Sequence, residues 1–118
     1  MHRITQNEGN LITVRVSGRL TQEDYDQLIP AWEKEIAEHG SMRMLLLMED
    51  FHGWTPGAGW DDFHFTATHA KHIERVAMVG EKKWQEWFAK VGSLLVSEDV
   101  RYFDLANLSE AERWVRTD

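Results

Sequence analysis

Five consecutive apolar residues, Met44–Met48, constrain the fold of this chain more than any other stretch of its sequence. The run does not alternate apolar and polar side chains, so a strand formed there must be covered on both faces. Such strands are typical of the centre of a parallel sheet, where crossover helices lie on either side. The run is far shorter than the roughly 20 residues that span a bilayer. An α/β fold with a mainly parallel sheet is therefore expected.

Four further strands are expected around this central run. Residues 12–17 alternate apolar and polar side chains, which indicates a strand with one solvated face, and Gly18 is expected to end it. Residues 3–6 precede it across the turn-like residues 7–10, so these two strands are expected to pair. The other two strands are expected at residues 73–79 and 100–104.

Helices are expected between the strands. Residues 22–38 form the first, with Thr21 and Asp24 at the positions of a capping box and Gly40 at the C-terminal end. Pro30 is expected to kink this helix without ending it. The others are expected at residues 56–70, at residues 81–91 and after Ser109, where Ser109 and Glu112 form a second capping box. This order predicts one domain, residues 1–118, folded as a mostly parallel β-α superhelix with about five strands and four helices.

The charge and composition exclude several classes of partner. Thirteen lysines and arginines against 20 acidic residues give a net charge of −7, and the basic residues are not clustered. Nucleic-acid binding and purely electrostatic adhesion to an anionic membrane are therefore not expected. There is no cysteine for disulfide or thiol chemistry, and residues 1–10 are too polar for a signal peptide. A cytoplasmic location is expected.

The element order, with a strand that ends in an acidic pair, resembles the STAS domains (anti-sigma-factor antagonists) and smaller relatives with a CRAL-TRIO-like β-α superhelix. Four segments resemble the recurring segments of one such bacterial family, and the resemblance covers nearly the whole chain. They are residues 51–54 (FHGW), 60–63 (WDDF), 79–84 (VGEKKW) and 100–104 (VRYFD). The resemblance implies a non-enzymatic domain with an apolar cavity and a capacity for membrane association.

One stretch departs from the STAS pattern. STAS regulators carry a phosphorylatable serine at the start of the helix after the central strand, whereas residues 54–59 read WTPGAG. Thr55 has the only hydroxyl in this stretch and is expected to cap the helix. A phosphorylation switch is therefore not expected.

The polar residues give only weak signals of a nucleotide, metal or ligand site. The glycine-rich residues 53–59 lack both the P-loop lysine and the GxGxxG spacing, so no nucleotide is predicted. Asp61 and His64 have the spacing of helix-borne ligands, but nothing completes a set of four, so no metal and no cofactor are predicted. Asp50 and Asp104 are expected at the carboxyl ends of parallel strands, where α/β sheets place ligand sites.

The six tryptophans are more informative. On the second expected helix, Trp60 and Phe63 share the inferred core stripe with two alanines, whereas Phe65 points the opposite way. Trp54 lies in the expected loop 51–54, and glycines around the helix start suggest that this segment moves as a lid. Aromatic side chains outside a core stripe indicate a partner.

The leading hypothesis is a non-enzymatic binding module with an apolar cavity between the sheet and the second and third helices. Its ligand is expected to be a lipid or another apolar small molecule, with peripheral contact to the inner membrane face and homodimer formation as options. Asp50 is expected to orient a polar end of the ligand. The expected lining residues are Phe51, Trp54, Trp60, Phe63, Trp84, Trp87 and Phe88.

Two alternatives stay open. The first is a STAS-type protein–protein regulator without the phosphorylatable serine, which docks its partner through the loop and the second helix. The second is a small enzyme that uses Asp50 and the nearby histidines, which are His52, His64, His69 and His72.

Overall fold

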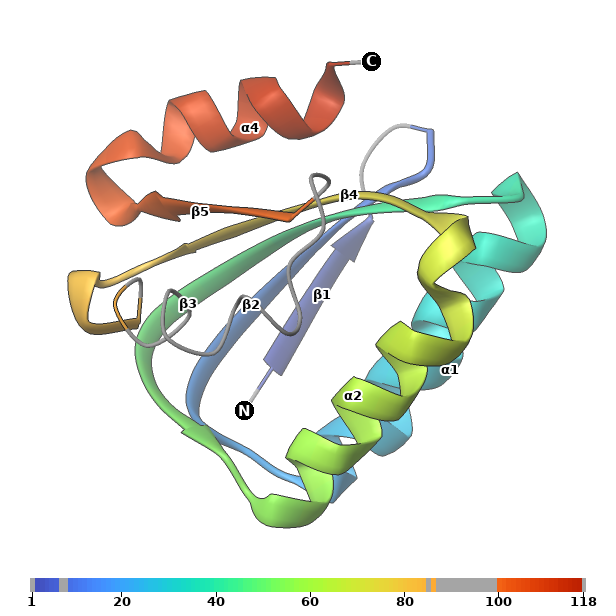
Figure 1. Ribbon diagram of the computed structural model, residues 1–118, viewed down its shortest axis with the longest axis horizontal. Helices are drawn as coiled ribbons and strands as arrows, with labels where there is room; N and C mark the ends of the chain where they lie inside the picture. Colours follow the sequence, from blue (N-terminus) through green and yellow to red (C-terminus); the bar gives the residue numbers. More distant parts are fainter. Residues whose placement is uncertain (1, 7–8, 85, 87–99, 118) are drawn as a thin grey trace.

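The fold is built on a five-stranded sheet with helices on both of its faces (Figure 1). The computed structural model describes residues 2–6, 9–84, 86 and 100–117. The strands are β1 (His2–Gln6), β2 (Leu11–Leu20), β3 (Met42–Trp54), β4 (Ile73–Gly80) and β5 (Val100–Asp104). The helices are α1 (Gln22–His39), α2 (Pro56–His69) and α4 (Leu108–Arg116), with short 3-10 turns η1 (Ala70–His72) and η3 (Leu105–Asn107). Residues 82–84 and 86 are also helical, while residues 85 and 87–91 of the predicted third helix lie outside the described residues.

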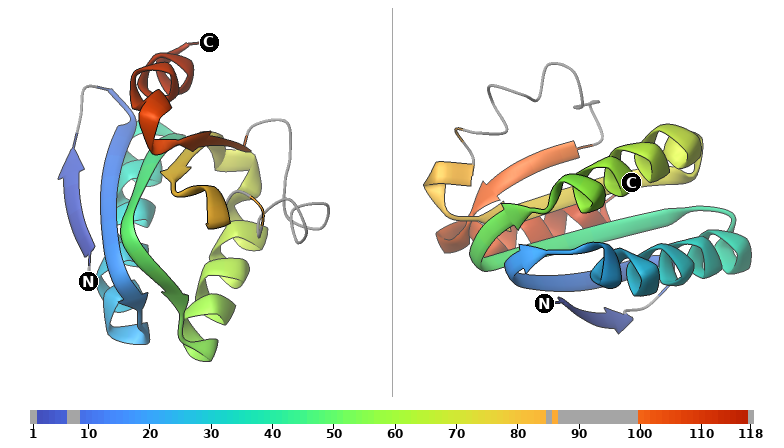
Figure 2. Two further views of the ribbon diagram at one scale, coloured as in Figure 1. Left: turned by 90° about the vertical axis from the view of Figure 1, so that its left-hand side faces the viewer. Right: turned by 90° about the horizontal axis from the view of Figure 1, so that it is seen from below.

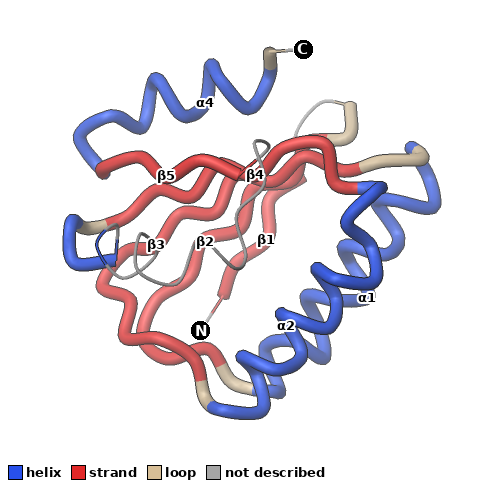
Figure 3. Tube along the Cα trace, in the orientation of Figure 1, coloured by secondary structure: helices blue, strands red, loops and turns tan. Residues whose placement is uncertain are grey.

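The strands follow the order β1-β2-β3-β4-β5 across the sheet. β1 pairs antiparallel with β2, whereas β2, β3, β4 and β5 pair in parallel. Helices α1 and α2 lie side by side over one face, and α4 lies over the other (Figures 2 and 3). The predicted α/β class with a mostly parallel sheet is confirmed. None of the described helices has the length and apolar character that a membrane crossing requires.

The central strand β3 is covered on both faces, as its unalternating apolar run predicted. On the side of α1 and α2, Met42 and Met48 are completely buried. On the side of α4, Leu45 and Leu47 pack in a second cluster that includes Val115. The sheet therefore separates two apolar layers, and β3 contributes to both.

The strands β2 and β3 are longer than the sequence predicted. Gly18 does not end β2, and β3 does not end at Glu49-Asp50 but continues to Trp54. The continued segments pair with each other, with Gly18 opposite Phe51 and Leu20 opposite Trp54. Gly18 and Asp50 adopt positive φ angles of 60° and 52°, and the register shifts around Gly18. These residues form an irregularity that bends the strand pair instead of ending it. Figure 1 shows β2 and β3 curving together toward the starts of α1 and α2.

The capping box of α1 is confirmed. The Thr21 hydroxyl accepts a hydrogen bond from the Asp24 N–H at 3.3 Å, and the Asp24 carboxylate accepts one from the Thr21 N–H at 2.9 Å. Asp24 also contacts His2 Nδ1 at 2.7 Å, which ties the edge strand β1 to the start of α1. Gly40 ends the helix in the left-handed conformation, with φ 79°.

The capping box predicted for the last helix is wrong. Ser109 lies inside α4, whose N-cap is Asn107 without a side-chain capping bond. The 3-10 turn η3 moves the helix start forward, and the Asp104 carboxylate caps this turn by accepting from the Ala106 N–H at 3.0 Å. The local Ser-x-x-Glu pattern could not reveal that the chain was already turning at Leu105.

The Asp24 contacts should make the stability of the protein depend on pH in the acid range. Partial burial alone would raise the pKa of Asp24, but the hydrogen bonds with His2 and Thr21 outweigh it and lower the pKa from 3.8 to about 2. A folded-state pKa below the unfolded value stabilises the protein above about pH 4, and this stability is lost as the pH falls through about 2. The free energy of unfolding can be measured in urea at about pH 6 and about pH 2. Between these pH values it should fall by about 2 kcal/mol more in the wild type than in Asp24→Asn. An equal loss in both proteins would contradict this account.

Candidate functional site

Three aromatic side chains lie together at the C-terminal end of β3. Phe51, Trp54 and Trp84 form this aromatic cluster, with ring centroids 5.0 Å apart for Phe51–Trp54, 4.9 Å for Phe51–Trp84 and 5.9 Å for Trp54–Trp84. Phe51 is completely buried, while both tryptophans are partly exposed. Trp84 comes from the helical residues after β4, which lie beside the bend of β3 (Figure 1). The cluster thus joins the buried layer under α1 and α2 to the surface.

Both indole N–H groups of the cluster are used inside the protein. Trp54 Nε1 donates to the Tyr25 hydroxyl at 2.9 Å, and Trp84 Nε1 donates to the Phe51 carbonyl at 3.0 Å. Gly53 has φ 101°, and a Cβ atom there would lie 3.4 Å from Trp84 Cη2. A glycine at this position therefore lets the Trp84 ring lie against the strand. These bonds hold the rings in place and leave mainly carbon atoms at the surface of the cluster.

The segment predicted to be a mobile lid is part of the sheet. Residues 51–54 belong to β3, and the Thr55 N–H continues the ladder by donating to the Leu20 carbonyl at 2.9 Å. The lid prediction treated Gly53 as a loop residue, whereas its positive φ angle occurs within the strand.

Helix α2 faces the core with the side opposite to the one predicted. Phe65 is 4% exposed, and its ring centroid lies 5.1 Å from that of Trp32. Trp60, predicted on the core stripe, is 66% exposed. The helix carries apolar residues on more than one face, so its sequence pattern did not determine which face is buried. Ala58 supplies the inner face near the helix start, where its small side chain lets α2 approach the core.

The predicted lining residues are not all brought together. Asp50 has a side chain that is 91% exposed, and its carboxylate lies 3.6 Å from His52 Nε2, so it does not point into the aromatic cluster. Trp60 lies at the surface of α2. Trp87 and Phe88 lie outside the described residues, as does the side chain of Phe63.

The start of α2 is held by Thr55. Its hydroxyl accepts a hydrogen bond from the Ala58 N–H at 3.4 Å, the capping role that the sequence predicted. A phosphate on this oxygen would have to replace that bond.

Of the residues of the alternative enzymatic site, Asp50 lies beside His52, whereas the other three histidines lie on α2 and η1. Asp104 caps η3, while His69 stacks on Phe65 at 4.3 Å and its Nδ1 lies 3.1 Å from the Phe65 carbonyl. His64 and His72 are exposed. Near Asp104, burial and the neighbouring carboxylates of Asp104 and Glu81 raise the pKa of Tyr102 well above its usual value. The Tyr102 hydroxyl donates to the Glu81 carbonyl at 2.8 Å, so it serves as a structural donor.

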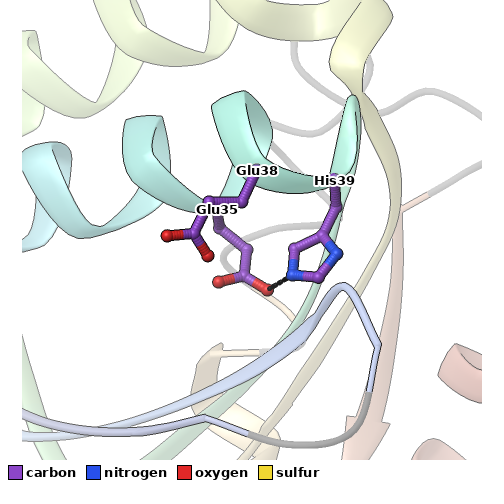
Figure 4. Close-up of side chains that lie close together, drawn as sticks. All are labelled: Glu35, Glu38 and His39. Atoms are coloured by element: carbon purple, nitrogen blue, oxygen red, sulfur yellow. Dashed lines mark ion pairs between the residues drawn. The ribbon is translucent and has the colours of Figure 1, made fainter.

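One group of polar residues was missed in the sequence. Glu35, Glu38 and His39 place potential metal-ligating atoms within 4.8 Å of one another on α1 (Figure 4). Their i, i+3, i+4 spacing was the available signal. Glu35 is 3% exposed and pairs with His39 Nε2 at 3.3 Å, while Glu38 lies 3.8 Å from Lys34 Nζ. Each carboxylate therefore faces a basic side chain on the same helix, and these contacts account for the group as helical ion pairs.

Comparison with known proteins identifies related chains. A family model described as SpoIIAA-like matches residues 11–116. Among solved structures, the chain is similar to an uncharacterized protein from the DUF3478 family with a SpoIIAA-like fold, from Shewanella loihica PV-4. The two share 25% sequence identity with a TM-score of 0.77, over 98% of this chain and 92% of the other. No curated protein gives a significant match.

Alanine substitutions on α2 should separate its two faces. Phe65→Ala removes a buried ring against Trp32 and should lower the free energy of unfolding by about 3–5 kcal/mol. Trp60→Ala changes an exposed side chain and should shift it by less than about 0.5 kcal/mol. Urea unfolding of both variants measures these changes in the free energy of unfolding. A larger loss in Trp60→Ala than in Phe65→Ala would support the core stripe predicted from the sequence.

Proposed function

This chain belongs to the SpoIIAA-like family, and from that premise we propose that it is a non-enzymatic module that binds a lipid-like or other apolar ligand. The family fold supplies the framework, whereas the ligand class must follow from side chains at the site. The observation that carries the proposal is the 66% exposure of Trp60 on α2, in a structure that also has a partly exposed aromatic cluster at the end of β3. The residue before Trp60, Gly59, lies near this cluster, since a Cβ atom on Gly59 would lie 3.8 Å from Trp54 Cβ.

The chemistry of the cluster favours an apolar ligand. Because the indole N–H groups of Trp54 and Trp84 already donate to protein oxygens, these rings offer ring carbons rather than hydrogen-bond donors. Covering such surface stabilises a complex by about 25 cal/mol for each Å² removed from water. A hydrocarbon chain or a flat apolar molecule would gain this energy without leaving a buried donor unpaired.

Peripheral membrane contact is part of the proposal. Trp60, His64 and Thr68 follow one another at four-residue intervals along α2, and all three are exposed. None of these three residues has a carboxylate, but Asp61 lies one helical turn before His64, and the chain as a whole has a net charge of −7. Tryptophan is suited to the boundary between headgroups and acyl chains because its indole ring is both apolar and polar. Contact would therefore depend on the insertion of Trp60 rather than on charge.

A second candidate function is protein docking of the STAS type. An exposed tryptophan is also a common centre of protein interfaces, so the same Trp60 face could bind a protein partner. We propose no catalytic role, because Asp50 is exposed beside His52 while Asp104 caps a turn.

Vesicle binding tests the proposal. Trp60→Ala should reduce binding to neutral phosphatidylcholine vesicles roughly 10- to 150-fold, since the lost indole contact corresponds to roughly 1.5–3 kcal/mol. The melting temperature should be unchanged because the side chain is exposed. Leu105→Ala is the matched control, because Leu105 is 37% exposed and lies in η3, away from α2.

The results separate the candidates. Loss of vesicle binding in Trp60→Ala but not in Leu105→Ala supports the apolar-ligand proposal, as does a lipid retained by the purified protein in native mass spectrometry. No binding of the wild type to vesicles or to apolar fluorescent probes contradicts it. A protein that co-purifies with the wild type but not with Trp60→Ala would favour the docking function instead.

A further inference from the structure

The second face of the sheet is covered unevenly. Helix α4 packs against β3, β4 and β5, and the apolar cluster beneath it draws on Leu45, Leu47 and Val79. Leu11 at the start of β2 joins this cluster, whereas the rest of β1 and β2 carries polar side chains on this face, and Figure 2 shows these strands extending beyond α4. This open half of the sheet lies opposite the face that holds the aromatic cluster.

Two arginines are directly opposite each other on this open half. Arg3 of β1 and Arg15 of β2 are partners in the antiparallel register. The neighbouring pair Ile4 and Val14 packs into the layer under α1, so the alternation of side chains places Arg3 and Arg15 on the other face. Guanidinium groups stay charged at all physiological pH values, and like charges directly opposite on antiparallel strands are destabilising. The sheet therefore carries an electrostatic cost at this position.

The surroundings of the two arginines offset this cost only in part. Arg3, Arg15 and Glu49 line an open groove together with His2, Val16 and Ser17, which we call the arginine groove. Arg15 lies 3.3 Å from the Glu49 carboxylate, and both side chains are more than half exposed. Arg3 is exposed and makes no hydrogen bond or ion pair with any residue that the structure describes. Two guanidinium groups and the Glu49 carboxylate line the groove, while the Asp24 carboxylate contacts His2 from the start of α1.

We propose that the arginine groove binds a phosphate group. Guanidinium groups present paired N–H donors that match phosphate oxygens, so one phosphate between Arg3 and Arg15 would replace their repulsion with two charge-assisted contacts. Ser17 lines the same groove. The phosphate belongs either to a small phosphorylated molecule or to a lipid headgroup. This site does not rest on the proposed apolar function, because it lies on the opposite face of the sheet from Phe51 and Trp54.

The test is a titration of the full chain, followed by ¹H–¹⁵N NMR. Inorganic phosphate is added at constant ionic strength, with chloride as the compensating anion. Saturable shifts are expected at the amides of Arg3, Arg15 and Ser17. Arg3→Gln and Arg15→Gln should each weaken phosphate binding about tenfold, because each removes charge-assisted hydrogen bonds. Glu49→Gln should strengthen binding, because it removes the carboxylate that competes for Arg15.

Arg19→Gln is the matched control. Arg19 is an exposed arginine of the same strand, but it pairs with Gly53 and does not line the groove. The substitution changes the net charge by the same amount and should leave phosphate binding unchanged. Thermal melts before titration identify any variant that has lost its fold, and Arg3→Lys, which keeps the charge but loses the paired donors, provides a milder substitution.

The outcomes distinguish a small soluble phosphate ligand from a lipid headgroup, and two of them would contradict the proposed phosphate site. Saturation by glycerol phosphate at similar concentration supports a small soluble ligand, whereas stronger binding to phosphatidic acid vesicles than to phosphatidylcholine vesicles, lost in Arg3→Gln, supports a headgroup. Chemical shifts that change linearly with phosphate concentration without saturation contradict the proposed site, as does an equal loss of phosphate binding in Arg19→Gln. Trp60→Ala should retain phosphate binding, so failure of the apolar function and failure of the arginine groove are distinguishable.

Discussion

The burial of β3 on both faces is the constraint on which the rest of the structure depends. Met42 and Met48 fill the layer under α1 and α2, while Leu45 and Leu47 fill the layer under α4. A strand buried in this way requires helices on both sides, which parallel crossover connections provide. The same strand then runs on to Phe51, so the side chains that specify the fold and those of the aromatic cluster lie on one continuous element.

The extension of β3 beyond its apolar run places the aromatic cluster at the surface. If β3 ended at Asp50, Phe51 would lie in a loop without a fixed position. The positive φ of Asp50 instead bends the strand while its pairing with β2 continues to Trp54. An aspartate can take this conformation because its short polar side chain tolerates the left-handed region better than most residues. The bend and the ring contacts of Trp54 and Trp84 thus depend on each other.

Much of the fold could be predicted because its signals are local or strongly periodic. The apolar run 44–48 and the Thr21–Asp24 capping box each specify a structure within a few residues. The site was harder to predict, because residues that usually end strands here bend one, as at Asp50. The orientation of α2 also depends on a distant partner: Phe65 is buried because Trp32 of α1 lies opposite it, and nothing near Trp60 in the sequence indicates that its ring stays outside.

Since relatives share the fold, the chemistry particular to this chain must come from side chains placed on it. The two sheet faces differ in what they can offer a ligand. Near α2, both indole donors of the aromatic cluster are used internally, so a polar ligand would gain little there. Beside β1, the opposed guanidinium groups of Arg3 and Arg15 offer positive charge and hydrogen-bond donors. The sheet lies between these two surfaces. The two proposed ligand chemistries lie on opposite faces because β2 and β3 turn alternate side chains to opposite sides of the sheet.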